Sequence, residues 1–399
     1  MLEVEEAQAR IIAAVRPLPA ESVALTDATG RVLAGDIAAP ISLPPFDNSA
    51  MDGYAVRAAD VSAASAASPV RLKRIGDVPA GGNFSGAIES GMCVRVFTGS
   101  PLPRGADAVV MQEDTRATAE CVEVRDVVKP WENVRLAGED VKAGTVIARA
   151  GDRLNAAHIA LLGAAGMERF TVTKKPLLGV LGTGNELIEP GQPLAPGQIY
   201  ESNRAALASL VAQSGGTTRV FPLVRDTEEE TRLALEMAFA ECDAVVATGG
   251  VSVGEHDCVK PAFESLGGTM EFWKVNMKPG KPFVFGRRGD KFLFGLPGNP
   301  VSAFVTFLLL VRPAILKMQG ATELKLAEHS AVLAQSFQNT GERRHFMRVA
   351  VDASGEVRNA GAQASHMLSS LASANALLNV PPKTSWPAGR HAQVLRWEL

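Results

Sequence analysis

The sequence predicts a multidomain protein that combines one three-layer α/β domain with two β-rich parts, one of them a small C-terminal β-barrel. Residues 177–318 alternate short apolar runs with longer amphipathic stretches, which is the pattern of strands and crossover helices in a mainly parallel sheet. Residues 53–140 and 326–399 instead carry short apolar runs divided by Gly and Pro turns, which is typical of β domains. At 399 residues the chain is also too long for one typical domain.

The composition excludes several classes of protein. Hydrophobic residues make up 46% and charged residues 21% of the chain, so a large core is expected and bulk disorder is not. The net charge of −3 argues against a general nucleic-acid binder. The four cysteines are far apart and form no C-x-x-C pair, which fits a reducing compartment, and we expect a cytoplasmic protein. The acidic N-terminus and the lack of an apolar run of about 18 residues argue against a signal peptide and a membrane span.

The first 175 residues predict a helix, a β-rich domain and a connecting region. Residues 3–16 place Val4, Ile11, Ile12 and Val15 on one helical face, and Pro17 ends the helix. Short strands and turns follow over 22–39. We assign 47–140 to a β-rich second domain, and both 1–46 and 141–175, with a helix over 156–166, to a linker or dimerisation region.

Residues 176–325 form the predicted α/β domain. Its strands are expected at 177–181, 218–223, 244–247, 283–285 and 291–294, and its helices at 203–213, 228–241, 260–266 and 301–318. The predicted barrel, 326–399, has strands at 330–333, 346–351, 356–358, 376–380 and 392–397.

Two glycine loops follow buried strands of the predicted α/β domain. The stretch AVVATGGVSVGEHD, 244–257, contains Gly249, Gly250, Ser252 and Asp257, and LGTGNEL, 181–187, contains Gly182, Thr183, Gly184 and Glu186. Each loop alone is as well explained by an ordinary tight turn. Because parallel strands deliver such loops to one edge of the sheet, where glycine N–H groups can approach a phosphate, the pair favours a binding site.

Two further stretches add positive charge and a helix start to the same edge. NMKPGKPF, 276–283, carries Lys278 and Lys281 around a stiff Pro-Gly turn, although turn lysines are usually solvated. GLPGNPVS, 295–302, places Pro297, Asn299, Pro300 and Ser302 at the start of a long apolar helix, which is also what a plain helix cap needs. Together the four stretches predict a cleft for a phosphorylated ligand with a divalent cation.

A polar loop precedes the second domain. In PPFDNSAMDGYAV, 44–56, small polar residues and two acids lie between two prolines and a strand. The loop is either an Asx-type turn that enters the strand or a loop that presents Asp52 to a ligand.

These stretches together resemble the molybdopterin molybdotransferase family, which includes the MoeA-type proteins and the E-domain of gephyrin. The matching segments occur in the family's order: PPFDNSAMDGYAV (44–56), TGSPLPRGADAVVMQE (98–113), GEDV (138–141), GTGNEL (182–187), TGGVSVGEHD (248–257), KPGKPF (278–283) and GLPGNPVSAF (295–304). The differences are mild: Pro45, Asn185 and His256 stand where the family often has other residues.

The resemblance implies a fold, an assembly and a reaction. It implies an elongated linker, a second domain, a molybdopterin-binding α/β domain and a barrel, assembled as a homodimer whose cleft lies between the α/β domain of one subunit and the second domain of the other. The implied reaction is the last step of molybdenum cofactor synthesis, in which adenylylated molybdopterin and molybdate react with Mg²⁺ assistance and AMP leaves. The implied partners are the upstream adenylyltransferase and acceptor molybdoenzymes.

The resemblance also implies residue roles. It makes Asp257, Asp52, Asp140 and Glu186 the catalytic acids, with Mg²⁺ on Asp257 and Asp140. It assigns ligand binding to Thr98, Gly182, Thr183, Gly184, Gly249, Gly250, Ser252, Lys278, Lys281, Pro297, Asn299, Pro300, Ser302, Arg348 and Ser365, of which Arg348 and Ser365 are barrel positions that face the cleft. Two other functions remain open: a molybdopterin-binding scaffold without turnover, and an adenylyltransferase of related α/β fold, against which the additional β domains argue.

Overall fold

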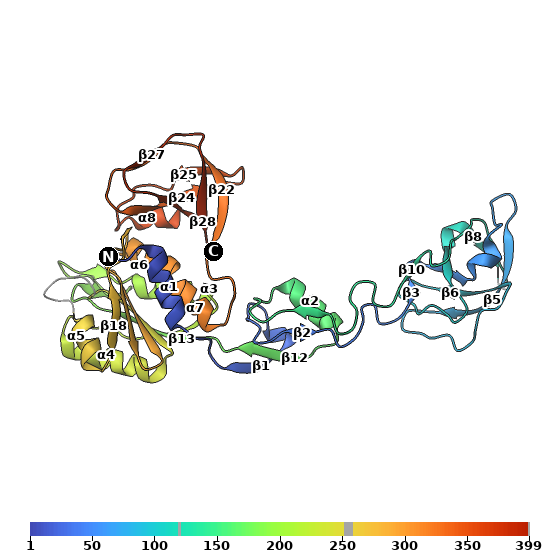
Figure 1. Ribbon diagram of the computed structural model, residues 1–399, viewed down its shortest axis with the longest axis horizontal. Coiled ribbons are helices and arrows are strands. Elements are labelled where there is room, and N and C mark those ends of the chain that lie inside the picture. Colours follow the sequence, from blue (N-terminus) through green and yellow to red (C-terminus); the bar gives the residue numbers. More distant parts are fainter. Residues whose placement is uncertain (119–120, 251–257, 398–399) are drawn as a thin grey trace.

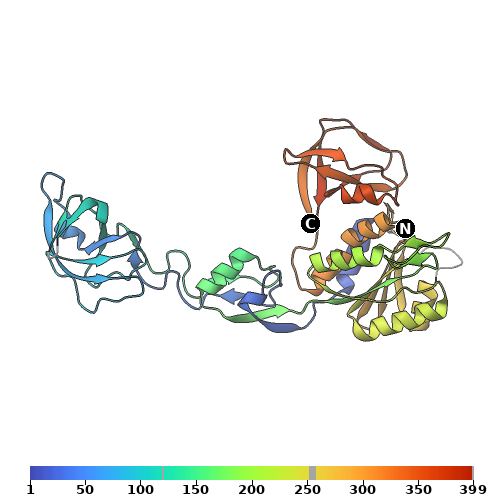
Figure 2. The same ribbon diagram turned by 180° about the vertical axis from the view of Figure 1, so that it is seen from behind.

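The computed structural model describes residues 1–118, 121–250 and 258–397, and these form four parts (Figure 1). The second domain stands at one end, the linker region lies in the middle, and the α/β domain with the barrel above it forms the other end. The view from behind shows the same separation (Figure 2). The predicted multidomain fold of α/β and β parts is confirmed.

The chain passes twice through the linker region. There β1 (Ala20–Ala24) pairs antiparallel with β12 (Arg169–Thr173), and β2 (Ile37–Ala38) pairs with β11 (Val146–Ala148). Helix α2 (Ala156–Ala164) begins at a capping box formed by Asn155 and His158. It covers a small core that includes Leu33, Leu154 and Leu162. Because the two passes pair with each other and enclose a core of their own, this region is a folded spacer and not a flexible linker.

The second domain is a six-stranded sheet in the order β7-β4-β6-β5-β9-β8. Its strands are β4 (Gly53–Val56), β5 (Val70–Val78), β6 (Met92–Val96), β7 (Ala108–Met111), β8 (Thr115–Ala117) and β9 (Cys121–Val124). At its base β3 (Asn48–Ser49) pairs with β10 (Val134–Arg135). Because side chains alternate along a strand, Tyr54 and Val56 join one apolar cluster while Ala55 joins another on the opposite face.

The α/β domain contains a six-stranded sheet in the order β16-β13-β17-β21-β20-β18. Its strands are β13 (Leu177–Gly182), β16 (Thr217–Val220), β17 (Ala244–Thr248), β18 (Thr269–Trp273), β20 (Val284–Arg288) and β21 (Lys291–Leu296). The sheet is mainly parallel as predicted, but β20 is antiparallel to both of its neighbours, because a tight turn at Gly289 joins it to β21. Strand β18 was not predicted.

Helices cover both faces of this sheet and form the predicted three layers. They are α1 (Val4–Ala14), α3 (Asn203–Gln213), α6 (Pro300–Thr306), η4 (Phe307–Val311) and α7 (Arg312–Met318) on one face, and α4 (Glu228–Glu241) and α5 (Val259–Ser265) on the other. Helix α1 contributes Val4, Ala7 and Ile11 to the core of the α/β domain, although the predicted division groups residues 1–46 with the linker.

The helix from Pro300 to Met318 is long and apolar. It has 19 residues and a mean hydropathy of 1.8, so by length and composition alone it could cross a membrane. However, 83% of this stretch is buried inside the protein, as expected for the core helix of a folded domain. Its middle turn, Phe307–Val311, is π-helical, which the sequence pattern does not indicate.

The C-terminal barrel closes through a pairing between β24 and β26. Its strands are β22 (Ala327–Leu333), β24 (Arg344–Val351), β25 (Glu356–Asn359), β26 (Ala376–Val380) and β28 (His391–Arg396). A small ribbon of β23 (Phe337–Asn339) and β27 (Thr384–Trp386) and the short helix α8 (Leu368–Ala372) complete it. Strand β19 (Met277–Lys278) pairs with β24 and thereby ties the α/β domain to the barrel.

Candidate functional site

The candidate site is a cavity of about 590 Å³ at the carboxyl edge of the α/β sheet, hereafter the sheet-edge cavity. It lies where the chain leaves β13 for β16 on one side and returns to β17 on the other, which is where ligands bind in open α/β sheets. The predicted residues that the structure brings together here are Thr183, Gly184, Glu186, Gly249, Gly250, Pro297, Asn299 and Pro300. The prediction that separate glycine loops converge on one edge is therefore confirmed.

The loop after β17 depends on its glycines. Gly249 and Gly250 have φ angles of +86° and +60°, in the left-handed region. A Cβ on Gly249 would lie 2.3 Å from the carbonyl oxygen of Thr183, and one on Gly250 would lie 2.9 Å from Thr183 Oγ1. That hydroxyl is buried and, among the described residues, has no hydrogen-bond partner. A polar atom left in this way beneath a glycine loop suits a ligand that supplies the missing partner.

Asn203 connects the loops of the site and was not predicted as a site residue. Its Nδ2 donates to Thr248 Oγ1 at 2.9 Å and to the carbonyl oxygen of Gly298 at 2.7 Å. Thr248 Oγ1 in turn donates to the carbonyl oxygen of Pro297 at 3.1 Å. One amide at the start of α3 therefore holds the ends of β17 and β21 in fixed register. The sequence predicts only the start of a helix at Asn203.

A buried arginine supports the wall of the cavity from behind. Arg204 donates through Nε to Glu201 at 3.0 Å, through Nη2 to Glu189 at 2.6 Å and through Nη1 to the carbonyl oxygen of Phe221 at 2.6 Å. The two carboxylates raise the pKa of Arg204, against the lowering effect of its burial. This ion-pair network fixes the segment that carries Glu201, which lines the cavity.

Three acids line the cavity within the described residues: Glu186, Glu201 and Asp226. Glu186 was predicted, whereas Glu201 and Asp226 were not, although Asp226 follows β16, which also ends at this edge. Asp226 Oδ2 accepts from the backbone N–H of Asn185 at 3.2 Å. In the part of the chain that the structure describes, no group of three or more His, Cys, Asp or Glu side chains could hold a metal ion. Ser252 and Asp257 lie outside the described residues.

The remaining predicted residues of this end surround the cavity. Lys278 and Lys281 are exposed and precede Pro282, which lines it. The backbone N–H of Val301, in the first turn of α6, donates to the carbonyl oxygen of Ser365 at 3.3 Å, so a barrel loop contacts the helix start. The next residue of that loop, His366, lines the cavity. Ser302 is buried within the helix, and Gly182 ends β13 beside Arg204.

Arg348 does not line the sheet-edge cavity of its own chain, although the resemblance places it at a cleft between two subunits. Its side chain is fully buried beneath the barrel loop 361–365, and burial lowers its pKa. Nε donates to Ser370 Oγ at 3.0 Å, and Nη2 donates to the carbonyl oxygens of Ala362 at 2.7 Å and Ala364 at 3.2 Å. The guanidinium therefore holds the loop that carries Ser365 and His366.

The predicted acids of the second domain lie far from the sheet-edge cavity of the same chain (Figure 1). Asp52 Oδ1 accepts from Thr98 twice, from its backbone N–H at 2.8 Å and from its Oγ1 at 2.9 Å. These two bonds, together with the charge of Arg95, lower the pKa of Asp52. Asp140 lies at the base of the domain, where its backbone N–H donates to the carbonyl oxygen of Leu43 at 3.1 Å. One chain alone does not bring these acids to the cavity.

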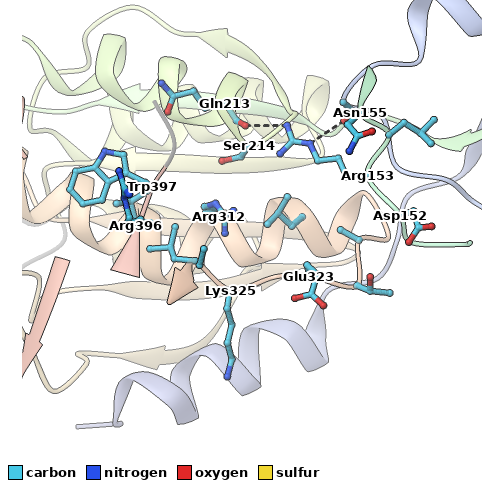
Figure 3. A pocket seen from close by; sticks show the side chains of 18 of the residues that line it. Asp152, Arg153, Asn155, Gln213, Ser214, Arg312, Glu323, Lys325, Arg396 and Trp397 are labelled. Atoms are coloured by element: carbon cyan, nitrogen blue, oxygen red, sulfur yellow. Dashed lines mark hydrogen bonds between the residues drawn. The ribbon is translucent and has the colours of Figure 1, made fainter. Parts of the chain in front are cut away.

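A larger cavity of about 1420 Å³ lies at the seam between linker, α/β domain and barrel (Figure 3). None of the predicted site residues lines it. Its wall carries charges of both signs: Arg153, Arg312, Lys325 and Arg396 against Asp152, Glu323 and Glu328. Such a mixed wall does not select a ligand of one charge, so the seam cavity is a weaker candidate than the sheet-edge cavity.

Models of known families match almost the whole chain. The MoeA N-terminal region (domains I and II) matches residues 2–166, a probable molybdopterin binding domain matches 179–317, and the MoeA C-terminal region (domain IV) matches 330–397. The chain belongs to the MoeA family. The domain matched as molybdopterin-binding is the one that holds the sheet-edge cavity.

Individual members of the MoeA family resemble the chain over its full length. It is 40% identical over 409 residues to molybdopterin molybdenumtransferase 2 of Mycobacterium tuberculosis, covering 100% of both chains. It is 37% identical over 385 residues to the molybdopterin molybdenumtransferase of Haemophilus influenzae, covering 95% of this chain and 94% of that one. A crystal structure of the MoeA molybdopterin biosynthesis protein from Pyrococcus horikoshii superposes with a TM-score of 0.86 at 33% identity, covering 100% of both chains.

Proposed function

We propose that this MoeA family member is a molybdopterin molybdenumtransferase. It inserts molybdenum from molybdate into adenylylated molybdopterin and releases AMP in the last step of molybdenum cofactor biosynthesis. The observation that carries the proposal is the convergence of glycine loops, a helix start and an orphaned hydroxyl on one cavity of the domain matched as molybdopterin-binding. The names of the full-length relatives support it.

Gly249, Gly250 and the 182–184 turn would hold the phosphate groups of the substrate. Positive φ angles and the absence of side chains let the Gly249-Gly250 loop come close to a ligand. Because the N–H groups of Thr183, Gly184 and Gly249 already donate to backbone carbonyl oxygens, the backbone donor to a phosphate would come from Gly250. The Thr183 hydroxyl could donate to a phosphate oxygen, and Ser252 would extend the same loop. Pro297, Asn299 and Pro300 would form the opposite wall. Lys278 and Lys281, two exposed cations beside this wall, would attract molybdate, with Ser302 and Ser365 nearby.

Mg²⁺ suits the chemistry of this donor set. Unlike a structural cation, it is usually bound by one or two carboxylates together with substrate phosphates, so a preformed protein cage is not required. We propose Asp257 and Asp140 as its ligands and Glu186 as a further acid of the site. A bound Mg²⁺ would neutralise charge at the phosphoanhydride.

We further propose that two copies of the chain complete one site. The second domain, which carries Asp52 and Thr98 and has Asp140 at its base, stands at the opposite end of the molecule from the α/β domain, and the linker between the two is built from paired strands (Figure 1). Met51 and Phe97, which neighbour Asp52 and Thr98 in the chain, and Phe46, which precedes them, are exposed apolar side chains. A second copy that brings its α/β domain to this surface would cover them and join the two halves of the site.

Two experiments test the function. Purified protein with Mg²⁺ and adenylylated molybdopterin should release AMP only when molybdate is added, and the product should activate a cofactor-free molybdoenzyme. Asp257→Ala should abolish AMP release while the protein still dimerises. Tight binding of the pterin nucleotide without release would instead favour the alternative, a molybdopterin-binding scaffold. Release of AMP by Asp257→Ala at the wild-type rate would contradict the role of Asp257.

A further inference from the structure

Arg95 lies beside Asp52 on one face of the second domain's sheet. Tyr54 pairs with Arg95 across β4 and β6, and Gly53 pairs with Val96. Because side chains alternate along a strand, Tyr54 shares a face with Asp52, two positions before it, and Arg95 shares that face with Phe97, two positions after it. The guanidinium carbon of Arg95 lies 4.9 Å from the ring centre of Tyr54 and 5.2 Å from that of Phe97. Its Nη2 donates to Gln112 Oε1.

All the groups that fix Arg95 are neutral. It is held by two aromatic faces and an amide, and among the described residues no carboxylate lies within ion-pair distance of it. The arginines of the neighbouring strand β5 differ: Arg71 pairs with Glu123 at 2.8 Å and Arg74 pairs with Asp77 at 2.5 Å. The charge of Arg95 contributes to the lowered pKa of Asp52, but the guanidinium forms no ion pair with that carboxylate and keeps its remaining N–H donors for an external anion.

The environment of Arg95 favours a phosphate as that anion. Asp52 is held on the same face by two bonds from Thr98, and its pKa is lowered, so the surface presents a fixed carboxylate beside a fixed cation. A phosphate that approaches this carboxylate is repelled unless a cation offsets the charge, and Arg95 supplies such a cation in addition to any bound metal ion. Arg95 has the forked geometry that binds two phosphate oxygens at once.

We propose that Arg95 is a substrate-binding residue that the second domain contributes to the composite site, where its guanidinium binds the phosphate of the adenylyl group. The inference rests on the proposed function and adds a residue and a ligand group to it. Arg95 of one subunit would contact the phosphoanhydride of adenylylated molybdopterin at the sheet-edge cavity of the other. After the reaction it would hold the phosphate of AMP until AMP leaves.

The test compares AMP binding by matched arginine variants of the full-length protein. Isothermal titration with AMP and Mg²⁺ would be run on wild type, Arg95→Met, Arg95→Lys and Arg71→Met, the last being an exposed arginine of the same sheet. Losing a charge-assisted contact should weaken AMP affinity roughly tenfold to hundredfold in Arg95→Met. Arg95→Lys should lie between it and wild type, because an ammonium keeps the charge but not the fork. Arg71→Met should bind as wild type.

Unchanged AMP affinity in Arg95→Met, or an equal loss in Arg71→Met, would overturn the inference. Thermal unfolding of each variant shows whether the domain is intact. If Arg95→Met does not fold, Arg95→Lys decides: weaker binding supports the role of Arg95, and wild-type binding refutes it. The assay does not depend on turnover. The proposed function alone would be refuted if wild type binds AMP through Arg95 but shows no molybdate-dependent release of AMP. This inference alone would be refuted if Arg95→Met releases AMP with an unchanged KM.

Discussion

Replacing Gly249 by alanine should damage the sheet-edge cavity more than its backbone angle alone explains. Alanine at a φ of +86° costs about 1–2 kcal/mol. The added Cβ would also lie 2.3 Å from the carbonyl oxygen of Thr183, whereas real Cβ atoms do not come closer than about 3.0 Å. That carbonyl cannot easily retreat, because the backbone N–H of Thr183 donates to the carbonyl oxygen of Thr248 at 3.0 Å. Overpacking of this kind costs a further amount of about 1–3 kcal/mol.

Gly191→Ala is the matched control. Gly191 has a φ of +92°, but a Cβ there would meet nothing within 4 Å, so this variant bears the backbone cost without the clash. The free energy of unfolding of both variants can be measured by urea denaturation, and their affinity for AMP by titration. We expect Gly249→Ala to be the less stable by about 1–3 kcal/mol and to lose AMP binding, while Gly191→Ala binds normally. Equal stability and equal binding of the two variants would refute the close-approach argument.

Three other predictions follow from single contacts. Asn203→Ala removes the donor shared by Thr248 and Gly298. The variant should lose about 1–3 kcal/mol in the free energy of unfolding and have a raised KM. A wild-type KM would contradict the positioning role of Asn203. Thr98→Val removes the hydroxyl bond to Asp52, so the pKa of Asp52 should rise toward its ordinary value. As the pH falls, the stability that the ionised carboxylate provides should then be lost at a higher pH than in wild type. NMR titration of the carboxyl group in both proteins measures this pKa, and an unchanged pKa would exclude the hydroxyl bond as a cause. Burial, with the charges of Lys278, Arg348 and Arg343, lowers the pKa of His345 from 6.5 to about 4. Between these two values the unfolded state binds more protons than the folded state, so the free energy of unfolding should fall as the pH drops. His345→Gln should reduce the loss of stability between pH 7 and pH 5 in denaturation curves, and an equal loss in both proteins would contradict the prediction.

The sequence predicts best those features that depend on local pattern. The bounds of α3 and α4 match the predicted 203–213 and 228–241, because helical periodicity and turn residues fix them. The glycine loops converge as predicted because parallel strands must end at the same edge. The β20–β21 hairpin and β18 were harder to recognise, since β18 has no alternating pattern that separates it from a loop and a hairpin within an α/β run breaks the expected crossover.

Long-range contacts explain what the sequence does not reveal. Asn203 reads as the start of a helix, and only the fold brings it within hydrogen-bond distance of Thr248 and Gly298, 45 and 95 residues away. Arg348 was expected to bind an oxyanion, and only the fold shows that a barrel loop covers it and accepts from its Nη2, while its buried Nη1 has no hydrogen-bond partner among the described residues. Arg95 carries no local signal either, because its environment arises from the pairing of β4 with β6.

The most direct measurement of the central claim is subunit complementation. Asp52→Asn alters the second domain and Glu186→Gln alters the sheet-edge cavity, and each alone should lack molybdate-dependent AMP release. If each site takes its halves from two chains, a mixed dimer of the two variants has one intact site of two. Random association on coexpression makes about half of the dimers mixed, so about a quarter of wild-type AMP release should return. No recovery in verified mixed dimers would contradict a site shared between subunits and would require Asp52 and the cavity to act within one chain or not together at all.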